Sequence, residues 1–323
     1  MISTILKGAA MGVAEVIPGV SGGTIAFITG VYERLLNCIK GVNPSLVGTF
    51  KSDGFKGVYY AIDGNFLAML MGGMLVGIVI GIFGVTYLLE EYPTPVWGFF
   101  FGLIIASSIY IGKQIPKWDA SKLIGLIIGF VIAFVITIIT PTEGSDNLLM
   151  VFLAGTIAIS ALILPGISGS FMLLLMGMYT IIIASIKSLF ADQDMASLII
   201  VFVFATGCLV GLAGFSRVLM WLLKEYKYNT FAILTGFILG SLNKIWPWRN
   251  VTVVMDKESG VVTKLFESND ALDLLPDSFK ILSEVNVLPV AYEMGNPLTF
   301  VTVVALIVGF ISVFFIERAN KSH

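Results

Sequence analysis

A helix-breaking segment occurs twice in this chain, each time inside an apolar stretch long enough to enter a membrane. The first copy reads AEVIPGVSGGT over residues 14–24, and the second reads ALILPGISGSF over residues 161–171. Irregular backbone survives in lipid only where it is buried in protein or lines a cavity. Paired breaks at corresponding places in the two halves of a chain indicate the substrate site of a transporter. The sequence therefore predicts a transporter.

The composition excludes most other classes of protein. The chain is 57% hydrophobic and only 12% charged, whereas soluble domains carry about 25% charged residues. The net charge of −2 and the lack of basic runs give no sign of nucleic-acid binding. Cys38 and Cys208 lack the spacing of a metal or redox site, and the only histidine is the terminal His323. We therefore expect no metal and no cofactor.

The apolar runs predict an all-α polytopic membrane protein. Six runs each have the roughly 17–25 residues that a spanning helix needs, and they lie near residues 66–89, 96–112, 121–140, 196–223, 228–245 and 298–316. The two motifs lie in shorter paired pieces, about 5–38 and 148–189, which we interpret as re-entrant helical hairpins. Each half, 1–145 and 146–323, then holds one hairpin and three transmembrane helices. Because three is odd, the second half starts on the opposite side, which makes an inverted repeat.

A second set of matches supports the duplication. Three small residues of the first half, Gly77, Gly102 and Ser107, recur 134 residues later as Gly211, Gly236 and Ser241. The motifs themselves are 147 residues apart, and a longer linker around residues 40–65 explains the difference. The alternative is chance similarity between two glycine-rich apolar segments.

The positive-inside rule predicts that both termini are cytoplasmic. Most of the 19 lysines and arginines then lie inside, and the outer segments hold Lys187, Lys244, Arg249, Lys257, Lys264 and Lys280. The polar insertion 246–296 lies outside in this orientation. Its segments 251–255 and 261–266 read as short strands around a turn at 256–260, and a solvated cap without chemistry is the simplest interpretation.

The broken helices offer an anion site without a charged side chain. A half-helix that starts inside a membrane has backbone N–H groups without partners, and these attract anions. We expect a phosphate headgroup to contact donors in both motifs, namely Ser21, Gly22, Gly23, Thr24, Ser168, Gly169 and Ser170. The alternative is structural: the glycines permit close helix packing and the serines only cap the half-helices.

Two ionisable residues, Glu15 and Arg217, lie well inside apolar stretches, where a charge is costly. The repeat places Leu162 and Phe83 at the equivalent positions, so the duplicated scaffold does not require these charges. Arg217 is a candidate bidentate clamp on a phosphate, or an anchor that snorkels to the interface. A desolvated carboxyl binds a proton more readily, so Glu15 is a candidate proton carrier, or else a structural partner of Arg217 or of backbone donors. One carboxylate and one arginine make no hydrolytic set, so we expect no catalytic residues.

Together with GFILGSLNKIWPW at 236–248, the motifs PGVSGGT and PGISGS resemble the PopT family of polyprenyl-phosphate translocases, formerly a membrane family of unknown function. The resemblance covers nearly the whole chain. It implies a multi-pass protein of a bacterial or archaeal cytoplasmic membrane. The implied activity is return of undecaprenyl phosphate, the carrier lipid of cell-wall synthesis, from the outer to the inner leaflet. The expected partners are this lipid and the surrounding membrane lipids.

Two other functions remain open from the sequence. The motif is similar to the PG-x-SRS segment of undecaprenyl-pyrophosphate phosphatases, but Gly22 and Gly169 replace its arginine and the paired glutamates of that family are missing. A small-anion channel or exchanger is the other alternative, because half-helix N-termini also bind chloride. The coupling ion, the length of the carrier lipid and the oligomeric state are open as well, and the glycine-rich span 72–84 would suit a homodimer.

Overall fold

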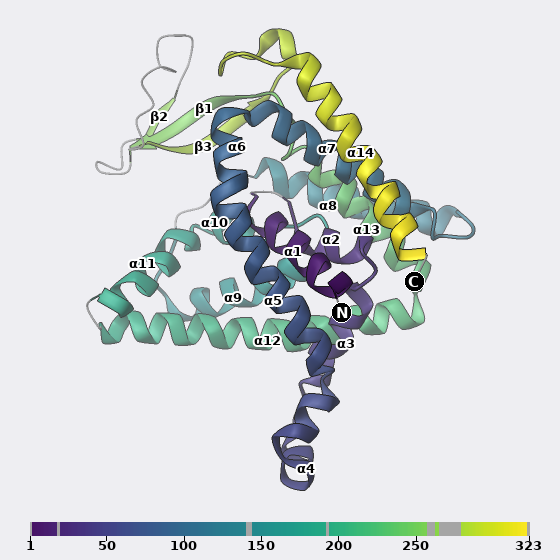
Figure 1. Cartoon of the computed structure of the whole chain (residues 1–323). Coiled ribbons are helices and arrows are strands. Elements are labelled where there is room, and N and C mark those ends of the chain that lie inside the picture. Colours follow the sequence, from purple (N-terminus) through teal and green to yellow (C-terminus); the bar gives the residue numbers. More distant parts are fainter. Residues whose placement is uncertain are drawn as a thin grey trace.

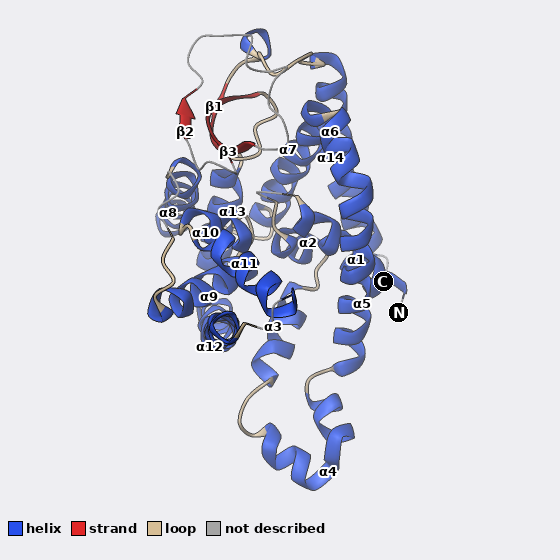
Figure 2. Ribbon diagram, turned by 90° about the vertical axis from the view of Figure 1, so that its left-hand side faces the viewer, coloured by secondary structure: helices blue, strands red, loops and turns tan. Residues whose placement is uncertain are grey.

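The computed structural model describes residues 2–17, 20–139, 144–191, 194–256, 262–264 and 279–321. Pro18 and Gly19 of the first motif lie outside the described residues, as does the predicted turn apart from Asp256. The described chain is mostly helical, with one small sheet near the C-terminal end of the sequence (Figures 1 and 2).

The first half consists of helices only. In chain order these are α1 (Ile2–Val16), α2 (Gly22–Ile28), α3 (Tyr32–Gly41), α4 (Leu46–Ala61), α5 (Gly64–Ile80), η1 (Gly81–Val85), α6 (Thr86–Glu91), α7 (Pro93–Gly112) and α8 (Ala120–Ile138). The π-helical turn η1 joins α5 to α6, so the three form one bent but continuous rod. The predicted linker at 40–65 contains a helix, α4, that has no buried residue.

The second half begins with α9 (Leu148–Ile163), α10 (Gly169–Leu175), α11 (Met178–Ala191), α12 (Met195–Glu225) and α13 (Lys227–Ser241). The insertion follows with β1 (Arg249–Asp256), β2 (Val262–Lys264), β3 (Phe279–Asn286) and the short η3 (Pro289–Ala291), and α14 (Thr299–Lys321) ends the described chain.

The predicted spans are present as helices, with one correction. Five described helices are long and apolar enough to cross a membrane: the α5–α6 rod, α7, α8, α12 and α14. The run predicted as a full span at 228–245 forms α13, which has only 15 residues. After Ser241 the chain continues in tight turns, in which the Lys244 N–H donates to the Ser241 carbonyl at 2.9 Å. The carbonyl of Asn243 accepts a hydrogen bond from Asn286 of the sheet at 2.9 Å. The bent pair α10–α11 would be a sixth span if it crosses as one broken helix.

Each predicted hairpin holds three helices rather than two arms. The short helices α2 and α10 have seven residues each, and each is followed by a glycine with positive φ, Gly30 (72°) and Gly177 (66°). Such a left-handed backbone suits glycine and ends a helix. A second break therefore follows the motif in both halves, and α10 and α11 meet at an angle of 105°.

Glycines allow the long helices to pack at very short range. α1 lies along α5 and α9 along α12, while α7 pairs with α14 and α8 with α13. A Cβ atom on Gly77 of α5 would lie only 2.0 Å from the Ala9 carbonyl oxygen of α1, and one on Gly309 of α14 only 1.9 Å from that of Phe99 in α7. Small residues bring helix backbones together in this way in membranes, where water does not drive association.

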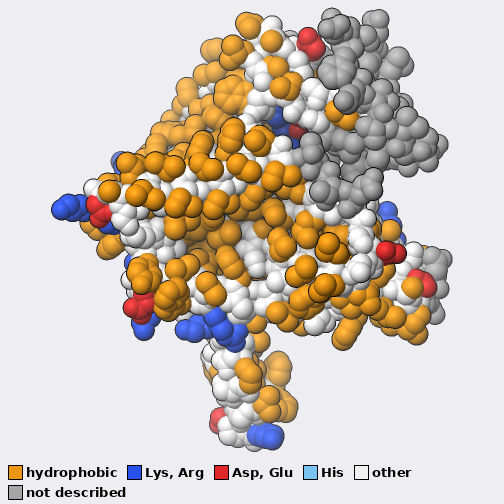
Figure 3. All heavy atoms as spheres, turned by 180° about the vertical axis from the view of Figure 1, so that it is seen from behind, with side chains coloured by type: hydrophobic (Ala, Val, Ile, Leu, Met, Phe, Trp, Pro, Cys, Tyr) orange, Lys and Arg blue, Asp and Glu red, His pale blue; other side chains and the backbone are white. Residues whose placement is uncertain are grey.

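Large apolar side chains cover much of the outer surface of this helical body. Figure 3 shows them spread over one face, with Lys, Arg, Asp and Glu gathered mainly near the margins. On α5 and η1, for example, Leu75, Val79 and Phe83 are all more than half exposed. Exposed apolar area of this extent is expected where the solvent is lipid.

The insertion folds as an antiparallel sheet in the order β2-β1-β3. Pairing of β1 with β2, such as Val254 with Thr263, confirms the predicted hairpin, whereas the sequence analysis missed β3. The sheet is tied to the helices by Trp248, whose indole N–H donates to the Pro297 carbonyl at 2.9 Å. The sheet and α4 lie at opposite ends of the molecule (Figures 1 and 2).

Candidate substrate site at the two helix breaks

The two motifs form equivalent helix breaks. After α1 and α9 end, the chain becomes extended at Ser21 and at Ser168, and each serine is the N-cap of the next short helix. Ser21 Oγ accepts from the Gly23 N–H at 3.1 Å, and Ser168 Oγ accepts from the Phe171 N–H at 3.4 Å. Both serines thus cap the half-helices, as the structural alternative predicted, because a serine hydroxyl commonly accepts from the free N–H groups at a helix start.

The tips of the two breaks contact each other. Ser21 Oγ donates to the Leu164 carbonyl at 3.3 Å, and the Gly166 N–H donates to Thr24 Oγ1 at 2.9 Å. Beside them the Tyr32 hydroxyl donates to the Ile163 carbonyl at 2.9 Å. Segments almost 150 residues apart therefore build one buried polar cluster, in which Thr24 is fully buried and Ser21 nearly so.

Glu15 is joined to the first break and not to Arg217. Its Oε1 accepts from the Gly22 N–H at 2.8 Å, which is a free donor at the start of α2. A Cβ on Gly22 would lie 2.4 Å from this oxygen, so a larger residue there would force the carboxyl to shift. The carboxyl group therefore occupies one of the donors predicted for the phosphate.

The second break is more open than the first. Ser168 is buried but Ser170 is exposed, and their hydroxyl oxygens are 3.0 Å apart. Gly22, Gly23 and Gly169 are all buried. Of the hydroxyl donors predicted in the two motifs, Ser170 is thus the one that faces outward.

Arg217 lies elsewhere in the described structure. Its guanidinium donates to the Ala213 carbonyl one turn earlier in α12 and to the Val42 carbonyl at 3.3 Å, directly after α3. Among the described hydrogen bonds, none joins Arg217 to either motif. The structure thus brings together the motif residues and Glu15, and it leaves Arg217 as a tie between α12 and the end of α3.

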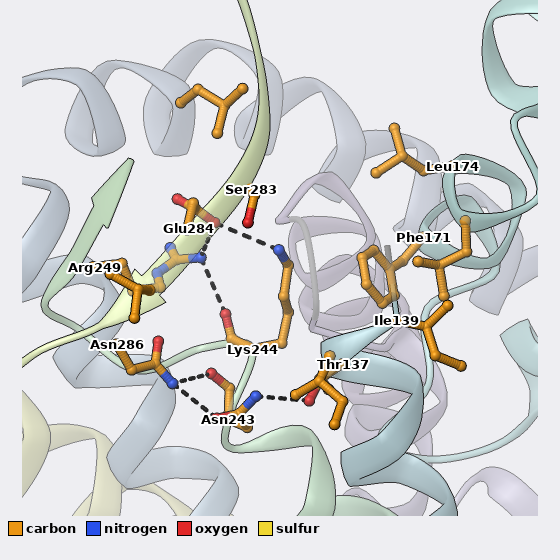
Figure 4. Close-up of a pocket in the computed structure, with 14 residues that line it drawn as sticks. Thr137, Ile139, Phe171, Leu174, Asn243, Lys244, Arg249, Ser283, Glu284 and Asn286 are labelled. Carbon is orange, nitrogen blue, oxygen red and sulfur yellow. Dashed lines mark hydrogen bonds and ion pairs between the residues drawn. The ribbon is translucent and has the colours of Figure 1, made fainter. Parts of the chain in front are cut away.

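Sequence reasoning missed two cations beside the second break. Lys244 and Arg249 line a cavity that also contains Phe171, next to the N-cap of α10 (Figure 4). They flank the Trp246–Trp248 segment, which is part of the motif that resembles the family. Their position in or beside this motif is the sequence feature that could have identified them. No group of three or more His, Cys, Asp or Glu suited to a metal ion occurs within the described ranges.

We expect Thr24→Val to weaken the contact between the two tips. Valine has nearly the shape of threonine, but it would leave the Gly166 N–H buried without an acceptor, which costs about 1–3 kcal/mol. Thermal unfolding in detergent should show a lower midpoint. Thr206→Val is the control, because the Thr206 hydroxyl donates within its own helix α12, to the Phe202 carbonyl at 2.8 Å. An equal midpoint for Thr24→Val and wild type would show that this hydrogen bond contributes nothing.

Comparisons with known proteins identify the family. A family model described as undecaprenyl phosphate translocase-like matches residues 11–263. A protein of Vibrio cholerae named polyprenyl-phosphate transporter is 44% identical over 282 residues, which covers 87% of this chain and 88% of the relative. A Staphylococcus aureus protein of the same name is 33% identical over 265 residues, covering 78% of this chain and 88% of the relative. No solved structure matches significantly.

Proposed function

The chain belongs to the undecaprenyl phosphate translocase-like family, and on this premise we propose that it returns undecaprenyl phosphate from the outer to the inner leaflet of the cytoplasmic membrane. It is a multi-pass membrane protein whose relatives are named transporters, which disfavours the phosphatase alternative. The proposed orientation has the termini and α4 in the cytoplasm and the sheet outside. The start of α1 and the end of α14 lie close together, which supports a common side for the termini (Figures 1 and 2).

The two halves, 1–145 and 146–323, are proposed to be inverted repeats, each with a re-entrant hairpin. Equivalent close contacts support this. A Cβ on Gly73 would meet the Ile5 carbonyl oxygen at 2.1 Å, and one on Gly207 would meet that of Phe152 at 2.2 Å. The glycines differ by 134 and their partners by 147, the two spacings found in the sequence. In the proposed repeat α7 corresponds to α13 and α8 to α14. The packed pair α7–α14 is therefore equivalent to the packed pair α13–α8.

The observation that carries the proposal is the buried contact between the two tips. In repeat-built transporters the substrate site lies where broken helices of the two repeats meet. A lipid phosphate needs polar groups only for its headgroup, because the isoprenoid tail can stay in lipid. Motif donors are proposed to replace the hydration of the headgroup: Ser21, Gly22, Gly23, Thr24, Ser168, Gly169 and Ser170. Several of these groups already have partners in this structure: Ser21 bonds to Leu164, Thr24 to Gly166 and Gly22 to Glu15. Separation of the tips would therefore accompany transport.

Glu15 is proposed to couple transport to protons. Its carboxylate and a phosphate oxygen would compete for the same Gly22 N–H. Protonation weakens a carboxyl as a hydrogen-bond acceptor, because charged acceptors bind more strongly. A proton on Glu15 would therefore release the donor for the headgroup, and loss of that proton would favour release of the substrate.

The direct test is translocation of a fluorescent short-chain polyprenyl phosphate in proteoliposomes. We expect wild-type protein to move the lipid faster than empty liposomes do. A lipid with the same tail and a neutral headgroup is the control for general membrane disturbance. Folded protein that moves neither lipid would contradict the proposal, and a chloride leak in its place would favour the small-anion channel.

Arg217→Ala tests the proposed clamp. If the guanidinium leaves Val42 and contacts the headgroup during transport, its loss should cost about 1.5–3 kcal/mol of binding, or roughly tenfold or more in affinity. Binding of the labelled lipid to purified protein measures this. Affinity equal to that of wild type would leave Arg217 only its role between α12 and α3.

A further inference from the structure

A cavity of about 390 Å³ lies where the sheet meets the helical body. Its walls come from β3, the end of α8, the short helix α10 and the connection between α13 and β1 (Figure 4). The polar side is formed by Thr137, Asn243, Lys244, Arg249, Glu284 and Asn286. Ile138, Ile139, Leu174 and Leu175 form an apolar side. The cavity thus combines polar and apolar walls, as an amphipathic ligand requires.

Two cations in this cavity share a single carboxylate oxygen. Glu284 Oε2 lies 2.9 Å from the Arg249 guanidinium and 3.4 Å from Lys244 Nζ. The described lining residues hold no other acidic side chain, so one positive charge is in excess. A surplus of positive charge in a recess raises the local concentration of anions.

Arg249 is already occupied by its surroundings. Its side chain is only 10% exposed, and its guanidinium lies 4.4 Å from the centre of the Trp97 ring. It also donates to the Lys244 carbonyl at 3.1 Å. Burial lowers the pKa of the Arg249 guanidinium, and the nearby Glu284 carboxylate partly offsets this. Arg249 therefore holds Glu284 and the Lys244 backbone in place.

Lys244 is the available cation. Its side chain is 28% exposed, its bond to Glu284 is long, and its ammonium group lies 5.1 Å from the centre of the Phe171 ring. An ammonium group has three donors, and among the hydrogen bonds of the described residues one, to Glu284, engages them. In Figure 4 the ammonium group lies between Glu284 and Phe171, at the boundary of the polar and apolar walls.

The cavity adjoins the second helix break. A smaller recess is lined by Gly166, Ile167, Ser168 and Ser241, and it shares Thr137, Phe171 and Lys244 with the larger cavity. Lys244 therefore stands beside both the cavity and the break. An anion held by Lys244 would be next to the motif donors.

The duplicated scaffold does not require these cations. At the spacing of 134 residues, Lys244 corresponds to Tyr110 and Arg249 to Ile115. The equivalent positions in the first half thus carry no charge. The two halves therefore differ in charge at these two positions.

We infer that this cavity is the docking site for a phosphate monoester headgroup, with Lys244 as its direct contact and the apolar wall receiving the start of the tail. The inference rests on the proposed function and adds the place at which the lipid headgroup first binds the protein. Loading is strongest from the leaflet on the sheet side. A free phosphate ion presents the same headgroup chemistry, and the test separates the two sources.

The test compares wild type, Lys244→Gln, Lys244→Arg and the control Lys187→Gln in proteoliposomes. Labelled polyprenyl phosphate is supplied to one leaflet at a time. We expect Lys244→Gln to raise the half-saturating lipid concentration about tenfold from the sheet-side leaflet, the size of one charged hydrogen bond, and less than about twofold from the other. Lys244→Arg should restore loading, and Lys187→Gln should match wild type, since Lys187 lies outside the cavity lining.

The possible failures are distinguishable. If wild type does not translocate the lipid, the proposed function fails. If wild type translocates it and Lys244→Gln loads equally well from both leaflets, only the docking site is overturned. A second measurement is the binding of inorganic phosphate to purified wild-type and Lys244→Gln protein. Phosphate binding that depends on Lys244, combined with lipid loading that does not, would make the cavity a free-phosphate site and overturn the lipid assignment.

Discussion

Gly77→Val should prevent stable folding, whereas Gly72→Val in the same helix should leave the protein intact. A Cβ on Gly77 would lie 2.0 Å from the Ala9 carbonyl oxygen, while nothing lies within 4 Å of one on Gly72. The obstacle at Gly77 is backbone, which cannot rotate away as a side chain does. Overpacking costs about 1–3 kcal/mol where side chains can adjust, so we expect about 3 kcal/mol or more here.

The measurement is the amount of monodisperse protein after detergent extraction, followed by its thermal unfolding midpoint. Both substitutions replace a helical glycine by valine, so any change in helix propensity is shared and the difference reports packing. The repeat predicts the same outcome in α12. Gly211 is the repeat equivalent of Gly77, and its Cβ would lie 2.6 Å from the Thr156 carbonyl oxygen, so Gly211→Val should behave like Gly77→Val. Gly214→Val should behave like Gly72→Val, because nothing lies within 4 Å of a Cβ there.

Wild-type yield and stability for Gly77→Val would mean that α1 and α5 do not approach as closely as described. A severe effect at Gly77 with none at Gly211 would instead weaken the proposal of equivalent halves. The two positions together therefore test the close packing of α1 on α5 and the proposed repeat as separate hypotheses.

The broad organisation follows from features that are local in sequence. Long apolar runs predict the long helices because each run supplies its own backbone hydrogen bonds in lipid. The motif predicts the break and its serine cap, since Ser21 and Ser168 are each followed at once by a new helix. The β1–β2 hairpin was likewise visible as two short strands around a polar turn.

Features that depend on distant partners were not predictable in the same way. The Thr24–Gly166 and Arg217–Val42 hydrogen bonds join residues more than 140 positions apart. The cavity depends on Lys244 and Glu284, which are 40 positions apart. Glu284 belongs to β3, the strand that the sequence analysis missed. The second breaks were overlooked because a single glycine inside an apolar run, such as Gly30 or Gly177, is also compatible with a continuous helix.

Glu15→Gln should abolish the dependence of transport on pH and on a proton gradient. Glutamine keeps an oxygen that can accept from the Gly22 N–H, so the hydrogen bond of 2.8 Å can persist while the negative charge and the titration are lost. With no proton to gain, the Gly22 donor can no longer be released by acidification. We expect gradient-driven translocation to fall about tenfold or more, equivalent to about 1.4 kcal/mol in a rate barrier.

The natural comparison for this variant lies within the repeat. The second half has Leu162 where the first has Glu15, so only the first break carries a carboxyl that competes with a phosphate. Leu162→Gln should therefore leave the pH response in place, as should Glu33→Gln, which removes an exposed carboxylate paired with Lys227.

The assay measures initial translocation rates over a range of pH, with and without an imposed gradient, at saturating labelled lipid. A Glu15→Gln rate equal to wild type throughout would end the coupling proposal and leave Glu15 as a structural partner of Gly22. A variant with normal lipid binding but slow, pH-independent transport would show that the proton acts when the headgroup leaves the Gly22 N–H. Because binding and rate are measured on the same preparation, a folding defect would be seen as a loss of both.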